Sequence, residues 1–153
     1  MKALDPQGFS LLLELLKEQG YTLLGPRVKD GAIVYDELHT AADLPIGWTD
    51  VQEAGRYQLE CRKDDAYFGY TLSPQSWNLF LHPPVLKLFS AKKTGQGLEI
   101  MEDSSEPPKY AFIGVRACEL EAILIQDKVF MGGPHQDQTY QSRRENAFIV
   151  AVN

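Results

Sequence analysis

Cys118 is the residue whose type and position most clearly allow chemistry. The apolar run Tyr110–Val115 before it is typical of a strand buried on both faces, and a helix is expected from Cys118 to Phe130. The thiol would then lie at a helix N-terminus and beside Arg116, and both neighbours favour thiolate over thiol. Three interpretations stay open from the residues alone: a metal or cluster ligand, a redox thiol, or a small residue in a tight strand-to-helix turn.

The other cysteine and the histidines offer no obvious second group for that thiol. Cys61 lies in an alternating stretch, Tyr57–Arg62, which predicts a half-buried core residue with no chemical role. A cysteine–histidine nucleophilic pair needs an imidazole within hydrogen-bond reach, and no histidine is close in sequence to Cys118. Two cysteines are too few for a disulfide framework, or for a structural zinc site without histidine help. The histidines also lack metal-ligand spacing; they are His39, His82 and His135.

The first two thirds of the chain predict a helix followed by antiparallel hairpins. Asp5 caps the helix, Pro6 begins it and Gly20 ends it. Asp-Gly at 30–31 is the favoured hairpin dipeptide, and Gly-Pro at 25–26 is interpreted as a turn. The other expected elements are strands over Tyr21–Leu24, Ala32–Tyr35, Tyr57–Arg62 and Tyr67–Leu72, an ordered loop over Thr40–Gly55, a short helix over Ser73–Phe80, and a hairpin of Leu86–Ala91 with Leu98–Glu102.

The last third predicts a parallel crossover. A second helix is expected from Asp137, its cap, to Asn146, and Ala147–Val152 is again wholly apolar. Strand, helix, helix and strand in this order favour a right-handed connection between two parallel strands. The predicted fold class is therefore α+β, with a mixed sheet, antiparallel hairpins in the N-terminal part and a parallel pair at the C-terminal end. Ligands gather beyond the carboxyl ends of parallel strands, which here are 114–118 and 152–153.

Composition and charge exclude several classes of protein. The 153 residues are 44% hydrophobic and 24% charged, which predicts one globular domain over 1–153. The net charge of −6 argues against a nucleic-acid or anionic-membrane surface. No apolar run is long enough to insert into a membrane, and the N-terminus lacks the apolar core of a signal peptide, so a reduced cytoplasmic protein is expected.

Two further features bear on partners and on the extent of the protein. Trp48 and Trp77 lie in stretches that resemble loops, where they mark either a partner surface or, as favoured here, packing of loops onto the sheet. The chain stops at Asn153, one residue past a strand interpreted as fully buried. This predicts a domain boundary with more protein beyond it.

Three motifs resemble one family, the iron–sulfur electron-transfer subunits that include the beta subunit of cytoplasmic nickel–iron (sulf)hydrogenases and the corresponding electron-transfer subunit of anaerobic sulfite reductases. The motifs are Ser73–Pro84 (SPQSWNLFLHPP), Ile113–Ile123 (IGVRACELEAI) and Arg143–Val150 (RRENAFIV). The family commonly has proline where this chain has Ala117. The resemblance covers most of the chain, and its strongest motifs lie after residue 73.

The resemblance implies the N-terminal domain of a longer electron-transfer protein, truncated after Asn153, with two [4Fe–4S] clusters in downstream segments. It implies Cys118 and Arg116 as cofactor-binding residues, no catalytic residue, and partners among the other subunits of a redox complex, including a flavoprotein reductase subunit. A [4Fe–4S] cluster needs four thiolates as a rule, so the 153 residues alone are expected to hold no metal or cluster. The alternative is a stand-alone enzyme with Cys118 as a reactive thiol.

Overall fold

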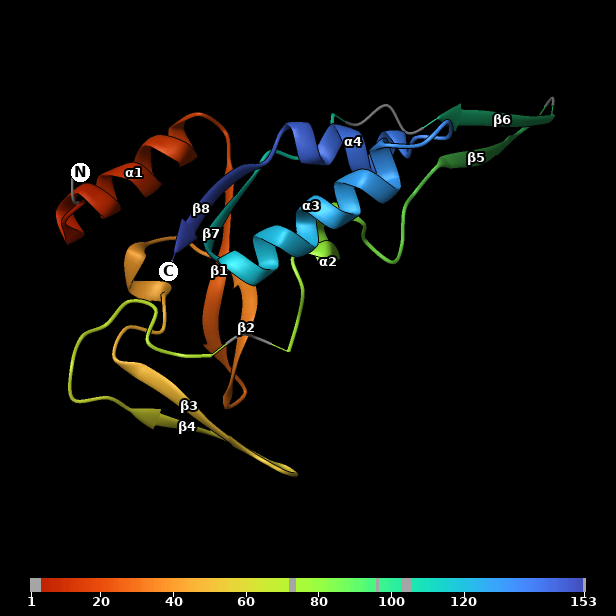
Figure 1. Cartoon of the computed structure of the whole chain (residues 1–153). Helices are drawn as coiled ribbons and strands as arrows, with labels where there is room; N and C mark the ends of the chain where they lie inside the picture. The colour runs from red at the N-terminus through yellow and green to blue at the C-terminus, as the bar shows by residue number, and fades with distance from the viewer. Residues whose placement is uncertain (1–3, 72–73, 96, 103–105, 153) are drawn as a thin grey trace.

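A four-stranded sheet forms the centre of the chain (Figure 1). The computed structural model describes residues 4–71, 74–95, 97–102 and 106–152. The sheet has the strand order β2-β1-β7-β8. Its strands are β1 (Thr22–Lys29), β2 (Ala32–Glu37), β7 (Tyr110–Arg116) and β8 (Phe148–Val152). β1 pairs antiparallel with β2 and parallel with β7, and β7 pairs parallel with β8, which confirms the predicted fold class and the predicted crossover.

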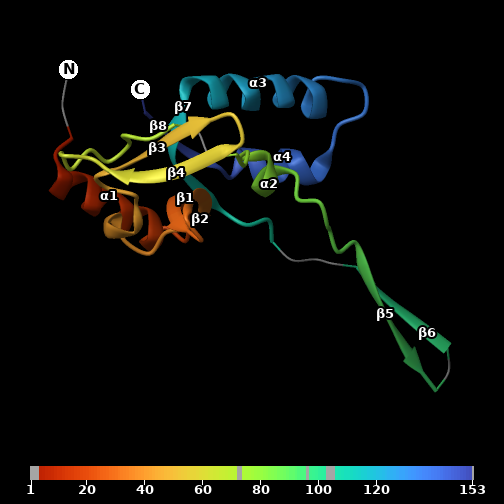
Figure 2. The same ribbon diagram turned by 90° about the horizontal axis from the view of Figure 1, so that it is seen from below.

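Helices lie on both sides of this sheet (Figures 1 and 2). They are α1 (Pro6–Glu18), α2 (Asn78–Leu81), α3 (Ala117–Met131) and α4 (Gln138–Glu145). The predicted caps are confirmed, because Asp5 accepts a hydrogen bond from the Gly8 N–H at 2.7 Å and Asp137 accepts one from the Tyr140 N–H at 2.9 Å. Within the described residues, no helix is long and apolar enough to cross a membrane.

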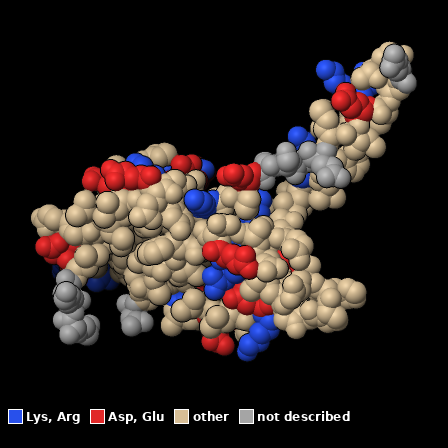
Figure 3. Space-filling view, turned by 90° about the horizontal axis from the view of Figure 1, so that it is seen from above, with Lys and Arg blue, Asp and Glu red and all other residues tan. Residues whose placement is uncertain are grey.

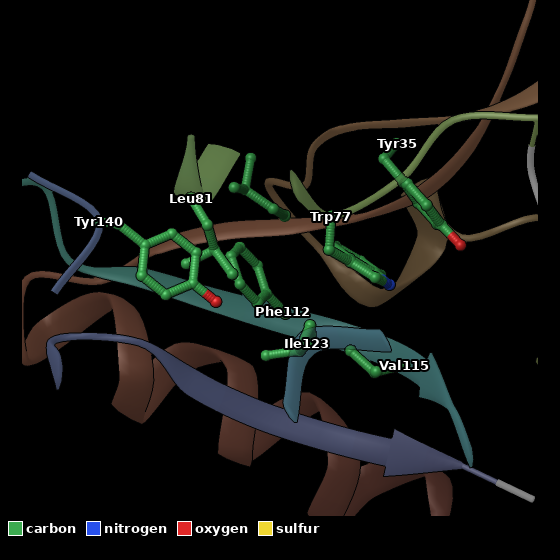
Figure 4. Close-up of a cluster of buried hydrophobic side chains, with 8 residues drawn as sticks. Tyr35, Trp77, Leu81, Phe112, Val115, Ile123 and Tyr140 are labelled. Carbon is green, nitrogen blue, oxygen red and sulfur yellow. The ribbon is translucent and has the colours of Figure 1, made fainter. Parts of the chain in front are cut away.

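The alternation of side chains along β1 and β7 divides the interior into two clusters. Leu23 and Ala111 face α1 and pack with Leu13 and Leu16. Leu24 and Phe112 face the opposite way. There they join a second cluster, which is completed by Tyr35, Trp77, Leu81, Val115, Ile123 and Tyr140 (Figure 4). Both faces of β7 are therefore buried, as its continuous apolar sequence predicts.

Two further hairpins lie outside the central sheet. The first pairs β3 (Trp48–Glu53) with β4 (Arg56–Cys61). The second pairs β5 (Phe89–Thr94) with β6 (Gly97–Glu102) and projects from the body as an arm (Figure 2). This hairpin is predicted, but its first strand begins three residues later than the predicted Leu86.

The structure corrects the prediction for two loops. Residues 25 and 26 are not a turn but lie inside β1, where proline is tolerated because this part of the strand pairs with β2 alone. The predicted loop Thr40–Gly55 contains a short 3₁₀ helix, Ala41–Asp43, and the whole of β3. The second half of the predicted loop is a strand because it pairs with β4. No local pattern within the loop indicates this pairing.

Cys61 is exposed, so its predicted place in the core is wrong. Alternation predicts burial only where one face of a strand packs on a core, and β4 is exposed on both faces except at Leu59. A hydrogen bond from the Ile33 N–H to the Tyr57 hydroxyl, at 3.2 Å, joins β4 to β2.

Three more elements differ from their predictions. Residues 67–71 form no strand, and arginine side chains instead of a strand ladder donate to the carbonyl groups of Phe68, Gly69 and Tyr70. Leu72 lies outside the described residues. The helix predicted over Ser73–Phe80 shortens to α2, and Ser73 is likewise outside the described part. β8 is an edge strand and is only half-buried, so the interpretation of a fully buried strand is also wrong.

Candidate functional site

The carboxyl ends of β7 and β8 open onto a pocket of about 740 Å³. This is the crevice that parallel strands favour for ligands. Arg116, Ala117 and Cys118 reach it from the β7–α3 junction, and Val152 reaches it from β8. The opposite wall comes from β3 and from the irregular segment after β4, which supply Gln52, Tyr70 and Thr71. The two predicted strand ends thus meet at one site.

Cys118 is the second residue of α3 and its side chain is exposed. The start of this helix is fixed by Glu119, whose carboxylate accepts a hydrogen bond from the Arg116 backbone N–H at 2.9 Å. The same carboxylate accepts a hydrogen bond from the hydroxyl of Tyr35. Burial first, and this hydrogen bond second, raise the pKa of Tyr35, so the hydroxyl remains a donor. A buried tyrosine on β2 therefore holds the helix start that presents the thiol.

The guanidinium of Arg116 binds protein carbonyl groups instead of turning toward Cys118. Its Nη2 donates to the carbonyl oxygens of Phe68, at 2.6 Å, and Tyr70, at 3.0 Å. The guanidinium carbon also lies 5.7 Å from the centre of the Tyr70 ring, within cation–π range. Arg116 lines the pocket, and its observed contacts fix the segment that forms the opposite wall.

A glycine in β7 allows this wall to approach. Gly114 has a φ of +88° and interrupts the register between β7 and β8. A β-carbon at this position would lie 2.6 Å from an atom of the Phe68 ring. Phe68 can therefore pack directly on the backbone of β7 because residue 114 has no side chain.

Asp50 joins β3 to the same wall. Its carboxylate accepts hydrogen bonds from the Thr71 N–H at 2.6 Å, from the Thr71 hydroxyl, and from the Gln52 amide at 2.7 Å. Burial raises the pKa of Asp50, but these hydrogen bonds more than offset that effect, so the pKa lies below its usual range. No local sequence signal predicts this cluster, because Asp50 and Thr71 are 21 positions apart.

Asp50 gives the wall a dependence on pH whose sign follows from its lowered pKa. A carboxyl whose folded pKa is depressed stabilises the fold above its unfolded pKa, and this contribution is lost as the pH falls through the folded value. Asp50→Asn is therefore expected to lower the free energy of unfolding by about 1 kcal/mol at neutral pH. Urea titrations at several pH values test this. A difference from wild type that persists unchanged well below pH 4 would contradict the assignment.

Among the residues that the structure describes, no histidine forms a hydrogen bond with Cys118. The His82 imidazole stacks on Phe130 of α3. Phe130 lies twelve residues after Cys118, which corresponds to roughly 18 Å along the helix axis. His82 also lies 3.6 Å from the carboxylate of Asp137. No hydrogen bond joins His39, His82 or His135 to the thiol, and in the described ranges no three His, Cys, Asp or Glu residues form a group that could hold a metal ion.

Serine replacements of the two cysteines are expected to leave the stability of this chain almost unchanged. Both thiols are exposed, and exposed substitutions away from special contacts usually stay within about 0.5 kcal/mol. Thermal unfolding of Cys61→Ser and Cys118→Ser measures this directly. A fall of several degrees in the melting temperature of Cys61→Ser would restore the interpretation of Cys61 as a core residue.

Comparison with known proteins gives a partial similarity. The chain is similar to the sulfhydrogenase 2 subunit beta of Pyrococcus furiosus, with 42% identity over 45 residues. These residues are 29% of this chain and 13% of that protein, so the match spans a small part of the relative's length. No protein-family model and no solved structure matches the chain.

Proposed function

We propose that this chain is the N-terminal domain of an iron–sulfur electron-transfer subunit in a redox complex of the hydrogenase or sulfite reductase type. The observation that carries the proposal is the 42% identity over 45 residues with a sulfhydrogenase beta subunit. The resemblance of the segment around Cys118 to such subunits supports it. In this proposal, two [4Fe–4S] clusters are held by cysteine-rich segments that follow Asn153.

The pocket supports a role in receiving those segments. It is open, it lies at the carboxyl ends of two parallel strands, and Cys118 is the one cysteine among its lining residues. Because a [4Fe–4S] cluster takes four thiolates as a rule, Cys118 would supply at most one of them. We assign Cys118 to contact with the cluster-bearing part of the protein, and Arg116 to holding the pocket wall that this part packs against.

The proposed partners follow from the same assignment. A protein that carries electrons must dock a donor and an acceptor, and a flavoprotein reductase subunit of the complex is the proposed partner. The cytoplasm is the proposed compartment, because both cysteines are free thiols, as is usual in reducing compartments. In this role the chain catalyses no reaction of its own.

The competing function is that of an enzyme with Cys118 as its nucleophile. Such an enzyme needs a base in hydrogen-bond reach of the thiol, in turn oriented by a third group. The contacts of the described residues give the thiol no such base. A docking role needs no base, and the exposure of the thiol at a pocket suits that role. The electron-transfer proposal is therefore the better supported of the two.

Matched cysteine variants of the full-length protein test the proposal. Cys118→Ser is expected to lower the cluster content or the rate of electron transfer, and Cys61→Ser, which alters an exposed thiol outside the pocket, is expected to change neither. The measurements are iron and sulfide analysis and the rate of reduction by the partner protein. If Cys118→Ser retains full cluster content and full activity, Cys118 is only a small residue in a tight turn.

A further inference from the structure

The two edges of the central sheet differ in whether they can accept another strand. In an antiparallel pair, every second residue turns its N–H away from the neighbouring strand. On β2 these outward N–H groups belong to residues 33, 35 and 37, and a side-chain oxygen binds each of them. The acceptors are the Tyr57 hydroxyl at 3.2 Å, the Gln75 amide at 2.8 Å and the Asp36 carboxylate at 2.9 Å. The N–H groups of the β2 edge are therefore not available to another strand.

The opposite edge of the sheet, β8, has no such caps in the described part of the chain. There, the backbone of 148–152 forms hydrogen bonds with β7 alone. Natural sheets often protect such an edge with charged side chains or proline, as the arm of β5 and β6 does with Lys92, Lys93 and Glu99 (Figure 3). The sequence of β8 is Phe-Ile-Val-Ala-Val, which contains neither. Unpaired backbone groups along an apolar strand are what another β-strand recognises.

The sequence of β8 is complementary to itself when two copies run antiparallel. A pairing centred on Val150 places residue 148 opposite 152 and residue 149 opposite 151, so every apolar side chain meets another apolar side chain. The two-fold axis of this pairing is perpendicular to the sheet, so each side chain stays on the same face of the joined sheet. No like charges meet across the contact, because β8 has no charged residue.

The same pairing brings an exposed ring to an apolar pocket. A pocket of about 360 Å³ lies over the face of β8 that carries Val150 and Val152, and Phe9 and Phe68 also line it. Phe148 lies on this face by alternation, and it is 39% exposed. Because residue 148 lies opposite 152 in the pairing, Phe148 of each copy approaches the pocket of the other. This match between a side chain and a pocket favours a second copy over an unrelated strand.

We propose that β8 is a dimerisation strand, and that it pairs antiparallel with β8 of a second copy of this chain. The two four-stranded sheets then form one continuous sheet, with the capped β2 strands at its two outer edges. The contact is isologous, so it closes as a dimer and does not propagate. It does not depend on the proposed electron-transfer function.

The strength of the contact follows from its size. Two strands of five residues cover less than the roughly 1,600 Å² of a standard stable interface. The dimer is therefore expected to be weak and dependent on protein concentration. Sedimentation velocity over about 1–200 µM covers the range in which such a dimer dissociates. A wild-type chain that stays monomeric throughout this range would overturn the proposal.

The same substitution at two exposed alanines tests where the contact lies. Ala151→Glu places a charge opposite Ile149 of the second copy and is expected to raise the dimer dissociation constant at least about tenfold. Ala91→Glu is the matched control, because it makes the same change on β5, outside the proposed contact, and is expected to leave the constant unchanged. Circular dichroism checks that both variants fold. Equal effects of the two substitutions would overturn the proposal.

Cysteine cross-linking tests the register in a chain whose two native cysteines are replaced by serine. In the proposed pairing, residue 150 lies opposite itself with roughly 4.5–5.5 Å between β-carbons, which is near the separation that a disulfide spans. Val150→Cys is therefore expected to give a disulfide-linked dimer on mild oxidation. Val152→Cys is the matched control, because residue 152 of each copy lies four residues from the other, roughly 13 Å along the strand. Equal cross-linking at both positions, or none at residue 150, would rule out this pairing.

Discussion

Trp77→Ala is expected to lower the free energy of unfolding by about 3–5 kcal/mol, the largest stability effect that we expect. Trp77 is 1% exposed, and its ring stacks on Tyr35 with 4.0 Å between ring centres. It also contacts Phe112 of β7 at 5.0 Å (Figure 4). Removal of the indole would leave a cavity between the sheet and α3, and urea unfolding monitored by circular dichroism measures the cost.

Two controls separate packing from other roles of this tryptophan. Trp48→Ala removes a half-buried indole and is expected to cost about 1–2 kcal/mol. Trp77→Phe keeps an aromatic ring and removes an indole N–H that has no hydrogen-bond partner among the described residues, so it is expected to cost less than Trp77→Ala. If Trp77→Ala were no more destabilising than Trp48→Ala, Trp77 would not be a central residue of this core.

Gly114→Ala is the second substitution with a large expected effect, about 2–4 kcal/mol. The added β-carbon meets the Phe68 ring at 2.6 Å, and alanine disfavours the φ of +88° that this position requires. Displacement of Phe68 would also strain the hydrogen bonds from Arg116 to the Phe68 and Tyr70 carbonyls. The pocket wall and the stability of the fold are therefore expected to weaken together.

Gly133→Ala is the matched control, because its nearest atoms lie 3.9–4.0 Å from the added β-carbon, an ordinary contact distance. It is expected to change the melting temperature little. Thermal unfolding gives the stability of both variants, and limited proteolysis within 66–71 reports on the wall. A Gly114→Ala protein as stable as Gly133→Ala, with an intact wall, would contradict the role given to the close approach of Phe68.

The sequence correctly predicts the parts of the fold that are set by a local signal, such as a cap or a turn, or by a run of apolar residues that the fold then buries. The Asp5 and Asp137 caps and the Asp-Gly turn are local, and each forms as predicted. The continuous apolar run at 110–115 predicts a buried strand, and the two core clusters do bury it on both faces. The parallel pairing of β7 and β8 follows from the two helices between them.

The errors arise where tertiary contacts decide the outcome. Cys61 alternates with polar residues as a core residue would, but no layer covers its strand. Residues 67–71 resemble a strand in composition, but the side chains of Arg62 and Arg116 bind the carbonyl groups of residues 68–70. The sequence indicates the strand end that carries Cys118. It does not indicate that Gln52, Tyr70 and Thr71 form the opposite wall, because these positions meet only after β3 and β4 pair.

Iron and acid-labile sulfide in the full-length protein, purified without oxygen, provide the most direct test of the proposed function. We expect broad visible absorption from thiolate-bound iron, iron and sulfide in the amounts of two [4Fe–4S] clusters, and bleaching when a reduced partner protein is added. Paramagnetic resonance of the reduced protein identifies the cluster type. Full-length protein that contains no iron and sulfide under these conditions, or that holds clusters which exchange no electrons with any other member of its complex, would contradict the assignment of this chain to an electron-transfer role.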